Sequence, residues 1–544
     1  MSLIAPLREP LFRRIWISSL LSNFGLLVVS IAAAWEMTRL SGDPSLVALV
    51  QSAIMSPFMI FSMLAGALAD IFDRRKIGLF ALVFPAAGTL GLTLFTVLGI
   101  ATPFALLAFC FLVGLGLAIF SPAWQASVGE QVSRRILPAA IALNGISFNV
   151  ARAIGPAIGG TLVAAAGTAV AFGVSFALYV PLFFALLAWR RSQEPSRLPP
   201  EKLHGALAAG LRYAYYSPGL KRILIRVFTI AFAISALQGL IPLIARDVLG
   251  GGADLYGLLL SSMGVGSIGG ALLVSRLQAK YEPETLLRVA MVLIAIAIAG
   301  VGLSQSALLT IVLLALAGAC WMTVMTLLNV LVQMGAPRWV TARALGLFQT
   351  LFAAGTALGS WTWGEFASTS GLTTAMVSAA GTMILFLGIG FLEPILRADG
   401  HSSPPGEMRP EPNIALAITG RSGPIMMELE YRIEPAKARD FYRQVSELGR
   451  VKQRNGARMW VIARDLHDPA IWMERYRYAT WDDFLRNRNR DTEAERNLQS
   501  EVSAMSEGGK VGVRRYLDRP VGSVRWNEEA PDRTEGDYLP PPIS

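Results

Sequence analysis

Apolar runs of about 20 residues follow one another along residues 1–400 of this 544-residue chain. A helix rises ~1.5 Å per residue, so a run of about 20 residues can cross a hydrocarbon core of about 30 Å. Each run is therefore expected to form a membrane-spanning helix. The twelve runs cover residues 12–38, 45–69, 77–99, 103–128, 138–165, 168–189, 222–246, 254–276, 286–304, 306–333, 341–366 and 373–395. The sequence thus predicts an all-α polytopic membrane protein over this part of the chain.

The basic residues indicate how these helices are oriented. The formal net charge is +10, and residues 1–400 hold 25 Lys and Arg against 15 Asp and Glu, whereas residues 401–544 hold 23 of each. With the N-terminus in the cytoplasm, 22 of the 25 basic residues lie on the cytoplasmic side, and only Arg39, Arg152 and Arg246 do not. Cytoplasmic loops are typically rich in Lys and Arg. We therefore expect both termini in the cytoplasm, and the basic balance reflects topology and does not indicate a nucleic acid partner.

The runs divide into two sets of six, which predicts two six-helix bundles at residues 1–190 and 222–400. The connection 191–221 carries Leu203, Leu207 and Leu211 at helical spacing, which predicts an amphipathic helix on the membrane surface. The two sets also resemble each other at an offset of 200 residues. The matching positions are Asn149, Gly155 and Gly159 in the fifth run, and Gln349, Gly355 and Gly359 in the eleventh. A repeated six-helix unit is typical of transporters that bind substrate between two bundles.

The composition changes after residue 400. Residues 401–423 are rich in Ser, Pro and Gly and are expected to form a linker. Apolar Met427, Leu429 and Tyr431 alternate with charged residues, which predicts a half-buried strand. A helix near 436–453, strands near 457–465 and 471–479, helical stretches within 480–506 and a strand near 510–517 follow. Residues 424–521 are therefore expected to form a small cytoplasmic α+β domain, followed by a disordered tail at 522–544.

Two motifs carry specific signals. The segment GALADIFDRRK, with Gly66, Asp70, Arg74 and Arg75, resembles the signature between spans 2 and 3 of the major facilitator superfamily, although Asp73 stands where the superfamily favours glycine. By this resemblance the small residue permits close helix contact and the charged residues control conformational gating.

The second motif lies in the fifth run, NGISFNVARAIGPAIGG. Gly155, Pro156, Gly159 and Gly160 resemble the glycine and proline signature of superfamily antiporters. Ala142 and Ala151 stand where that signature prefers glycine. Small residues let two helices approach closely, and proline removes a hydrogen bond and permits a bend.

Two longer stretches resemble the transmembrane secretion effector branch of the superfamily, to which enterobactin-type exporters belong. They are LVALVQSAIMSPFMIFSMLAGALADIFDRRK and SPAWQASVGEQVSRRILPAAIALNGISFNVARAIGP. The resemblance covers residues 1–395 and implies a twelve-helix major facilitator fold in a bacterial inner membrane. It further implies export of small organic molecules such as siderophores, and abundant Phe, Met and Trp in the runs favour amphipathic, drug-like substrates as well. No Walker sequence G-x-x-x-x-G-K-S/T occurs, so we expect proton coupling, and we expect no cofactor or metal. The tail segments RNGARMW and RDTEAE resemble those of some branch members, with a ferredoxin-like domain that implies a homodimer.

Several polar residues within the runs are candidates for the substrate cavity or for coupling. They are Asn23, Glu36, Gln51, Asn144, Asn149, Arg152, Gln238, Asn329 and Gln349. Arg152 lies roughly 21 Å along the fifth run, past the membrane midplane. An arginine there costs at least about 2.5–3.5 kcal/mol unless it faces a cavity or partners. It could bond carbonyls, attract an anionic or catecholate-like group, or act on a carboxylate such as Glu36. Glu36 could instead pair with Arg39.

Two alternatives to an exporter remain. The protein could be a transporter-like sensor that signals through its tail, or a bifunctional protein with a monooxygenase-like tail. Against catalysis, His467 is the only histidine of the α+β domain and lies in an expected loop beside Asp465 and Asp468. Cys110 and Cys320 lie in apolar runs, and no cluster has metal-ligand spacing.

Overall fold

The computed structural model describes residues 4–133, 135–189, 203–337, 340–394, 412, 414–416, 418–488 and 491–518. The chain forms two compact units. The helical unit consists of Met1–Leu207, Arg222–Val332 and Ala342–Arg397, and the sheet unit of Ala208–Lys221, Gln333–Thr341 and Ala398–Ser544. The segment 191–202, most of the expected linker 401–423 and the expected tail 522–544 lie outside the described residues, so the predicted domain limits stay predictions.

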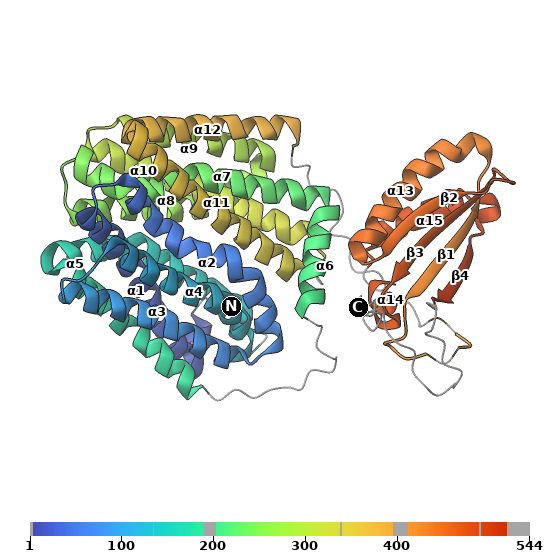
Figure 1. Ribbon diagram of the computed structural model, residues 1–544, viewed down its shortest axis with the longest axis horizontal. Coiled ribbons are helices and arrows are strands. Elements are labelled where there is room, and N and C mark those ends of the chain that lie inside the picture. The colour runs from blue at the N-terminus through green and yellow to red at the C-terminus, as the bar shows by residue number, and fades with distance from the viewer. Residues whose placement is uncertain are drawn as a thin grey trace, which may run out of the picture. The chain divides into compact units, whose positions relative to one another are not determined.

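Long helices make up the helical unit (Figure 1). They are α1 Pro10–Leu40, α2 Pro44–Ile71, α3 Arg74–Val97, α4 Pro103–Gln131, α5 Leu137–Ala188, α7 Pro218–Leu243, α8 Ala253–Lys280, α9 Pro283–Leu303, α10 Ala307–Gly335, α11 Thr341–Ser370 and α12 Leu372–Leu392. The 52-residue α5 contains two spans, because Gly167 leaves helical geometry with a φ of 85°. Counting these two, the described residues hold the twelve spans expected from the sequence, six in the first half (α1–α5) and six in the second (α7–α12).

Nine helices of the described part are long and apolar enough to cross a membrane, α5 among them. Two others differ from the expectation. α11 is 30 residues long but rich in small and polar residues. The described apolar part of α12, Leu372–Gly388, is short. Both nevertheless occupy the predicted eleventh and twelfth spans.

Local sequence explains where many of these helices begin. Proline occupies the first turn of α1, α2, α4 and α9, where its missing N–H leaves no helical bond unmade. Asp43, Asp73 and Thr102 precede α2, α3 and α4, and their side chains accept hydrogen bonds from backbone amides of the first turn. Asp73 therefore starts a helix at the position where the superfamily motif favours glycine.

The first part of α5 packs closely against α8. A carbon added at Gly160 would lie 2.4 Å from the Ala253 carbonyl oxygen and 2.9 Å from the Cα of Gly257. Pro156 cannot donate a helical hydrogen bond, and the next amide, that of Ala157, donates to the Ser261 hydroxyl across the contact at 2.8 Å. Backbone therefore meets backbone at this point, which requires glycine on both helices.

The opposite side of the same motif packs against α1. A carbon added at Gly155 would lie 3.0 Å from the Leu27 side chain, and one added at Gly159 would lie 3.2 Å from the Cα of Val28. The expectation that these glycines permit close helix packing is confirmed. A carbon added at Gly66 meets no atom within 4 Å in the described part of the structure, so the predicted close helix contact at Gly66 stays a prediction.

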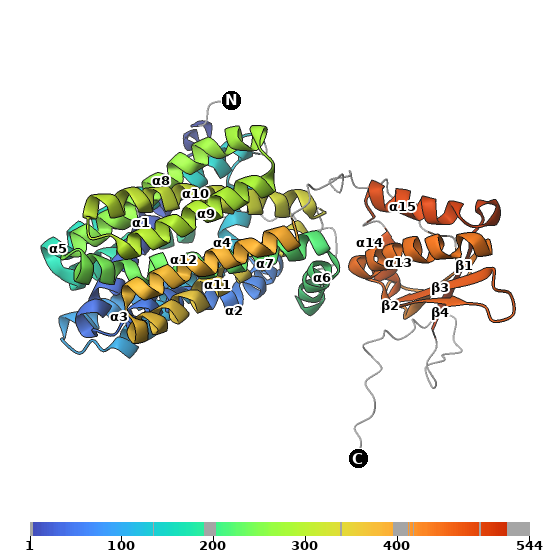
Figure 2. The same ribbon diagram turned by 90° about the horizontal axis from the view of Figure 1, so that it is seen from above.

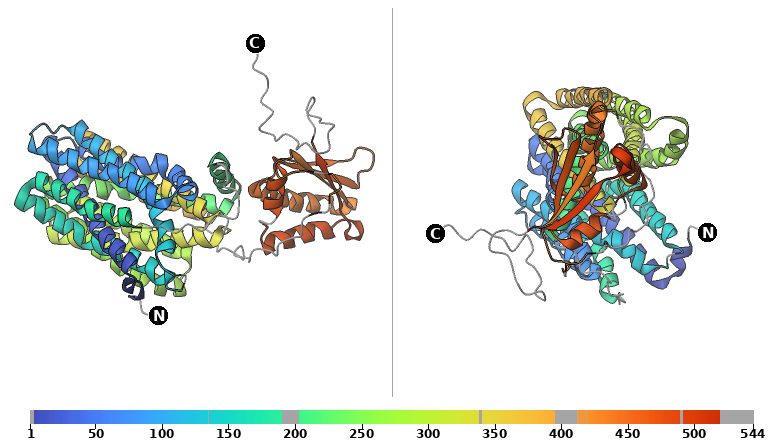
Figure 3. Two further views of the ribbon diagram at one scale, coloured as in Figure 1. Left: turned by 90° about the horizontal axis from the view of Figure 1, so that it is seen from below. Right: turned by 90° about the vertical axis from the view of Figure 1, so that its right-hand side faces the viewer.

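The sheet unit contains α6 Leu203–Tyr216 from residue 208 onward and the predicted α+β domain. The domain's elements are β1 Ile425–Arg432, α13 Ala438–Asn455, β2 Arg458–Arg464, β3 Ile471–Tyr478, α14 Trp481–Arg488, α15 Glu493–Ala504 and β4 Gly512–Leu517. The strands form one antiparallel sheet in the order β2-β3-β1-β4. Helices α13 and α15 lie over one face of this sheet (Figures 2 and 3). This is the strand order of a ferredoxin-like βαββαβ unit.

The core of this domain contains a buried carboxylate. Glu474 of β3 is fully buried and accepts hydrogen bonds from Lys452 Nζ at 2.8 Å, Tyr431 Oη at 2.9 Å and Trp460 Nε1 at 2.7 Å. Burial and the neighbouring carboxylate raise the pKa of Tyr431 above its usual range, so its hydroxyl stays protonated and donates. Every oxygen of Glu474 is satisfied, which explains how a charge is tolerated there.

The glycine contact between α5 and α8 generates the first prediction. Gly160→Ala places a carbon into the backbone of α8, and overpacking of this kind costs about 1–3 kcal/mol. Gly145→Ala is the matched control on the same helix, because a carbon there meets nothing within 4 Å, and alanine favours helix by about 0.5–1 kcal/mol. We expect the melting temperature in detergent to fall for Gly160→Ala and to stay or rise for Gly145→Ala. Equal melting temperatures would contradict the close contact.

Candidate functional site

The contact between α5 and α8 forms a seam between the two halves of the chain. Along α5 it contains Arg152, Ala153, Ala157 and Gly160, and along α8 it contains Gly257, Ser261 and Gly264. Ile146 of α5 and Leu272 of α8 lie further along the same two helices. Near Gly160 and Gly257 the seam residues are buried, but Ile146 is 41% and Leu272 71% exposed. The backbones of the two helices are in contact at Gly160 and Gly257, which we name the closed end. We name the direction toward Leu137 and Lys280, in which Ile146 and Leu272 are exposed, the open end.

A second seam joins α2 to α7 and α11. Gln51 Nε2 donates to Gln238 Oε1 at 3.1 Å, so two of the predicted cavity residues meet across the halves. Ser52 donates to the Ala357 carbonyl at 2.6 Å, and the Ser62 hydroxyl lies 2.6 Å from that of Thr350. These hydrogen bonds of hydroxyl groups join the two halves. The sequence alone does not show which of these side chains form pairs.

The other predicted cavity residues lie in different environments. Asn23 of α1 donates to the Ser147 hydroxyl of α5 at 3.3 Å, and Asn149 donates to the Gly145 carbonyl within its own helix at 2.9 Å. Asn144 and Asn329 are half-buried, whereas Gln349 is exposed. The structure thus brings together Gln51 with Gln238, and Asn23 with α5, but it does not gather all of these residues at one point.

Arg152 lies beside the transition between the closed and open parts of the α5–α8 seam. Its backbone carbonyl faces Gly264 of α8, where an added carbon would lie 2.4 Å from that oxygen. Its side chain is half-buried, and within the described part of the chain it has no hydrogen bond or ion pair. A positive charge within a span and without a protein anion is suited to meet an anionic or strongly polar ligand.

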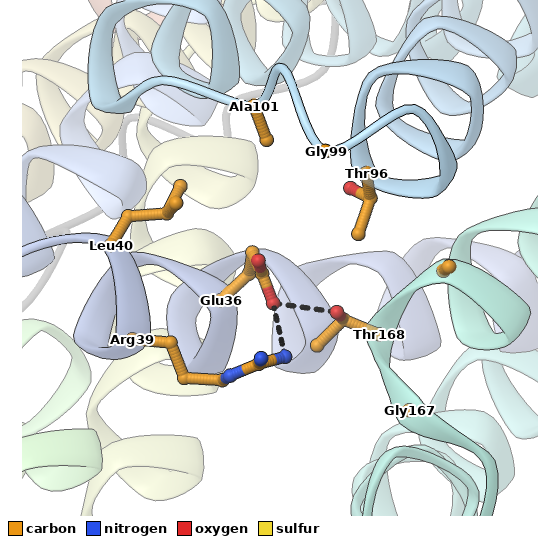
Figure 4. A pocket seen from close by; sticks show the side chains of 9 residues that line it. Glu36, Arg39, Leu40, Thr96, Gly99, Ala101, Gly167 and Thr168 are labelled. Carbon is orange, nitrogen blue, oxygen red and sulfur yellow. Dashed lines mark hydrogen bonds and ion pairs between the residues drawn. The ribbon is translucent and has the colours of Figure 1, made fainter.

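Glu36 lies elsewhere, in a pocket of about 310 Å³ beside the break in α5 (Figure 4). It is 5% exposed, and its Oε2 accepts hydrogen bonds from the Thr168 hydroxyl at 2.6 Å and from Arg39 Nη1 at 3.2 Å. The pocket is lined by Glu36, Arg39, Leu40, Thr96, Gly99, Ala101, Gly167, Thr168 and Ala169. The ion pair with Arg39 is therefore present.

The hypothesis that Arg152 acts on Glu36 stays a prediction. The hydrogen-bond partners of Glu36 are Arg39 and Thr168, and Thr168 follows Arg152 by sixteen residues, beyond the break at Gly167. Glu36 and Arg152 are two separate candidates.

The charged residues of the loop between α2 and α3 attach it to neighbouring helices. Arg74 forms an ion pair with Glu130 of α4 at 2.8 Å. Arg75 donates to the carbonyls of Leu186 and Leu187, at the end of the sixth span. A cation on the last carbonyls of a helix stabilises its terminus. The side chain of Asp70 lies outside the described residues, so its predicted gating role stays a prediction.

The second half repeats this arrangement, which sequence reasoning missed. Arg288, at the start of α9, donates to the Gly390 carbonyl of α12 at 2.7 Å and pairs with Glu284 at 3.0 Å. The same carboxylate accepts from the buried Arg226 of α7 at 3.3 Å. The signal in the sequence is the pair Glu284 and Arg288, four residues apart at the start of a span.

The described part of the α+β domain does not assemble a catalytic site around its histidine. The side chain of His467 is fully exposed, and its Nδ1 lies 3.9 Å from Asp465. Tyr476 and Tyr478 lie in the core, as expected for aromatic residues that alternate along a strand. Among the described residues there is no group of three or more His, Cys, Asp or Glu that could hold a metal ion.

Comparison with known proteins agrees with this architecture. The transmembrane secretion effector family matches residues 1–521. The enterobactin exporter EntS of Shigella boydii serotype 4 (strain Sb227) is 26% identical over 387 residues, 70% of this chain and 91% of the relative. EntS of Citrobacter koseri (strain ATCC BAA-895 / CDC 4225-83 / SGSC4696) is 27% identical over 386 residues with the same shares.

A solved structure shares the fold. A bacterial homolog of the human lysosomal transporter Spinster, in an inward-facing and unoccupied conformation, matches with a TM-score of 0.57 at 14% identity, over 72% of this chain and 97% of that one. The fold, the twelve spans and the family match agree with one another. This chain belongs to the transmembrane secretion effector family, and it is a multi-pass membrane transporter of the major facilitator type related to enterobactin exporters.

Proposed function

We propose that the chain exports small organic molecules, siderophore-like or amphipathic and drug-like, from a bacterial cytoplasm by alternating access. The observation that carries this proposal is the α5–α8 seam, which is buried at one end and exposed at the other. Two bundles that rock about a close contact open one end of such a seam while they close the other. The open end lies toward Leu137 and Lys280, which the distribution of basic residues assigns to the cytoplasm.

The substrate class rests on Arg152 and on the relatives. A lone guanidinium beside the open part of the seam favours an anionic or strongly hydrogen-bonding group, because such a group compensates a charge held within a span. The relatives are named as exporters of enterobactin. We therefore place the substrate at Arg152, between α5 and α8.

Glu36 is the best candidate for proton coupling. It is a buried carboxylate in a pocket, and Thr168 and Arg39 compensate its charge. Protonation would release Arg39, whose side chain is 63% exposed, and would change the contact between α1 and the break at Gly167. A carboxylate whose charge links two helices can couple proton binding to their relative position.

The face of the sheet away from α13 and α15 supports a homodimer. Apolar Met459 and Val461 of β2 are exposed, and Glu428 is buried there beneath Arg475, which donates to it at 2.8 Å. A sheet face that combines apolar side chains with a satisfied ion pair favours contact with a second copy of itself. We propose that two chains associate through this face.

Transport in inverted membrane vesicles tests the proposed export and its coupling. Enterobactin and the hydrophobic cation tetraphenylphosphonium serve as probes, with and without a pH gradient. We expect gradient-driven uptake by the parent. Glu36→Gln should lose the response to the gradient, because glutamine keeps a hydrogen bond with Thr168 but carries no titratable charge. Glu365→Gln, which changes an exposed carboxylate of α11, is the control and should keep it. Uptake of neither probe by the parent would contradict the proposal.

Substitution of Arg152 tests the substrate site. Arg152→Lys keeps the charge but loses the planar fork, and Arg152→Gln keeps polarity without charge. We expect partial transport by the lysine variant and none by the glutamine variant, with both present in the membrane at the level of the parent. Transport by Arg152→Gln at the rate of the parent would show that the guanidinium does not bind the substrate. Loss of folded protein in both variants would indicate a structural role for Arg152.

Orientation is tested by a peptide tag fused after Ser544. Protease added to intact spheroplasts should leave the tag in place, and the same protease should remove it after lysis, because the proposal puts the C-terminus in the cytoplasm. Cleavage in intact spheroplasts would reverse the topology and the direction of transport.

Light scattering of the full chain in detergent tests the dimer. Val461→Glu introduces a charge on the exposed sheet face and should convert the dimer to a monomer. Leu466→Glu is the control, because Leu466 is 97% exposed in the loop after β2, and it should leave the dimer intact. A monomeric parent, or a dimer in both variants, would exclude this face as the interface.

A further inference from the structure

The sheet unit joins three segments that are distant in the sequence. Besides the C-terminal α+β domain it includes residues 208–221, which contain most of α6, and residues 333–341, which run from the last residues of α10 to the first residue of α11 and are called loop 333–341 below. In the sequence, α6 belongs to the connection between the two halves of the transporter. One compact unit therefore contains the link between the halves, a loop of the second half and the added domain.

Tyr213 of α6 stands between the other two segments. It is 2% exposed, and its hydroxyl donates to the Gly335 carbonyl at 3.3 Å. The guanidinium carbon of Arg454 lies 5.4 Å from the centre of its ring, a cation–π contact. The phenol therefore bridges loop 333–341 and the α+β domain.

The domain holds this arginine firmly. Arg454 forms an ion pair with Glu495, which is 6% exposed. Glu495 also accepts from the backbone amide of Thr492 at 2.8 Å, and Thr492 begins α15 in a capping box. Asn455 donates to the same carboxylate at 3.3 Å. Arg454 is thus presented to Tyr213 by a fixed network at the start of α15.

The contact itself is small enough to break and re-form. Its contacts include hydrogen bonds of the neutral Tyr213 hydroxyl with Gly335 and Ser217 and a cation–π contact with Arg454, each of which contributes modestly to stability. Burial raises the pKa of Tyr213, and Arg454 partly opposes this effect. The hydroxyl therefore stays protonated at physiological pH and continues to donate to Gly335.

We propose that the C-terminal domain is a brake on the transport cycle that acts by holding α6 at Tyr213. This inference rests on the proposed alternating access. When two halves rock, the segment that connects them must move relative to at least one of them. A connection fastened to loop 333–341 and to the domain resists that movement, so the Tyr213 contact stabilises one state and must open for the cycle to proceed.

Tyr213→Phe tests the brake, with Tyr215→Phe as the matched control. Tyr215 lies two residues further along α6 and is 74% exposed. Tyr213→Phe keeps the ring beside Arg454 but removes the bond to Gly335. We expect uptake of enterobactin or tetraphenylphosphonium by inverted vesicles to rise about two- to fivefold for Tyr213→Phe and to stay at the parent rate for Tyr215→Phe. Unchanged or slower uptake by Tyr213→Phe would overturn the brake.

A reversible cross-link tests the same contact directly. Cysteines replace Tyr213 and Arg454 in the full chain, and a short disulfide-containing bis-maleimide joins them. Cysteines at Tyr215 and Leu466, two exposed positions outside the proposed dimer face, form the control pair. We expect a high cross-link yield only for the first pair, arrest of uptake by the cross-linked protein and recovery after reduction.

Equal yields from the two pairs would overturn the docking at Tyr213, and parental uptake by the cross-linked protein would overturn the brake. These outcomes are distinct from failure of the proposed function. If the parent takes up neither probe, the proposed export and the brake are both contradicted. The cross-link yield still tests the contact between Tyr213 and Arg454, because it does not depend on transport.

Discussion

The proposed movement of the two halves of this transporter depends on the backbone contact between α5 and α8. Gly160 and Gly257 allow the helices to approach so closely that their Cα atoms are van der Waals neighbours, and Pro156 leaves the adjacent amide to bond with Ser261 across the contact. A larger side chain at Gly160 or Gly257 would push the two helices apart, so the contact requires glycine on both. Movement of one half against the other is then easiest about this closed end.

Within each half, an arginine side chain also stabilises the end of the last helix. Arg75 caps the sixth span and Arg288 caps α12, so each half closes its last helix with an arginine from the start of its third. These bonds lie within a half and do not cross between halves. Each bundle is therefore internally braced, as rigid-body rocking requires.

The sequence predicts much of this architecture because spans and strands are encoded locally. The length of the apolar runs predicts the spans, and the alternation around Met427 predicts the first strand. Contacts between distant segments are not encoded in this way. Gln51 and Gln238 are 187 residues apart, and no local pattern pairs them.

The same limit applies to the candidate site. Gly66 follows the superfamily motif, but a carbon added there meets no atom within 4 Å among the described residues. Arg152 and Glu36 both stand out as charges in apolar runs, yet Glu36 bonds with Thr168 beyond the end of the span that carries Arg152. Composition identifies a charge within a span, but only the packing of the helices shows which partner it meets.

The central claim is that the α5–α8 seam opens and closes alternately at its two ends. The most direct measurement is the distance between spin labels at Ile146 and Leu272, exposed residues of the open end, and in a second protein between labels at Ile158 and Leu258, exposed near the closed end. On addition of enterobactin or a change of pH, we expect the first distance to shorten and the second to lengthen in the same population of molecules. Distances that stay unchanged, or that change in the same sense at both ends, would contradict it.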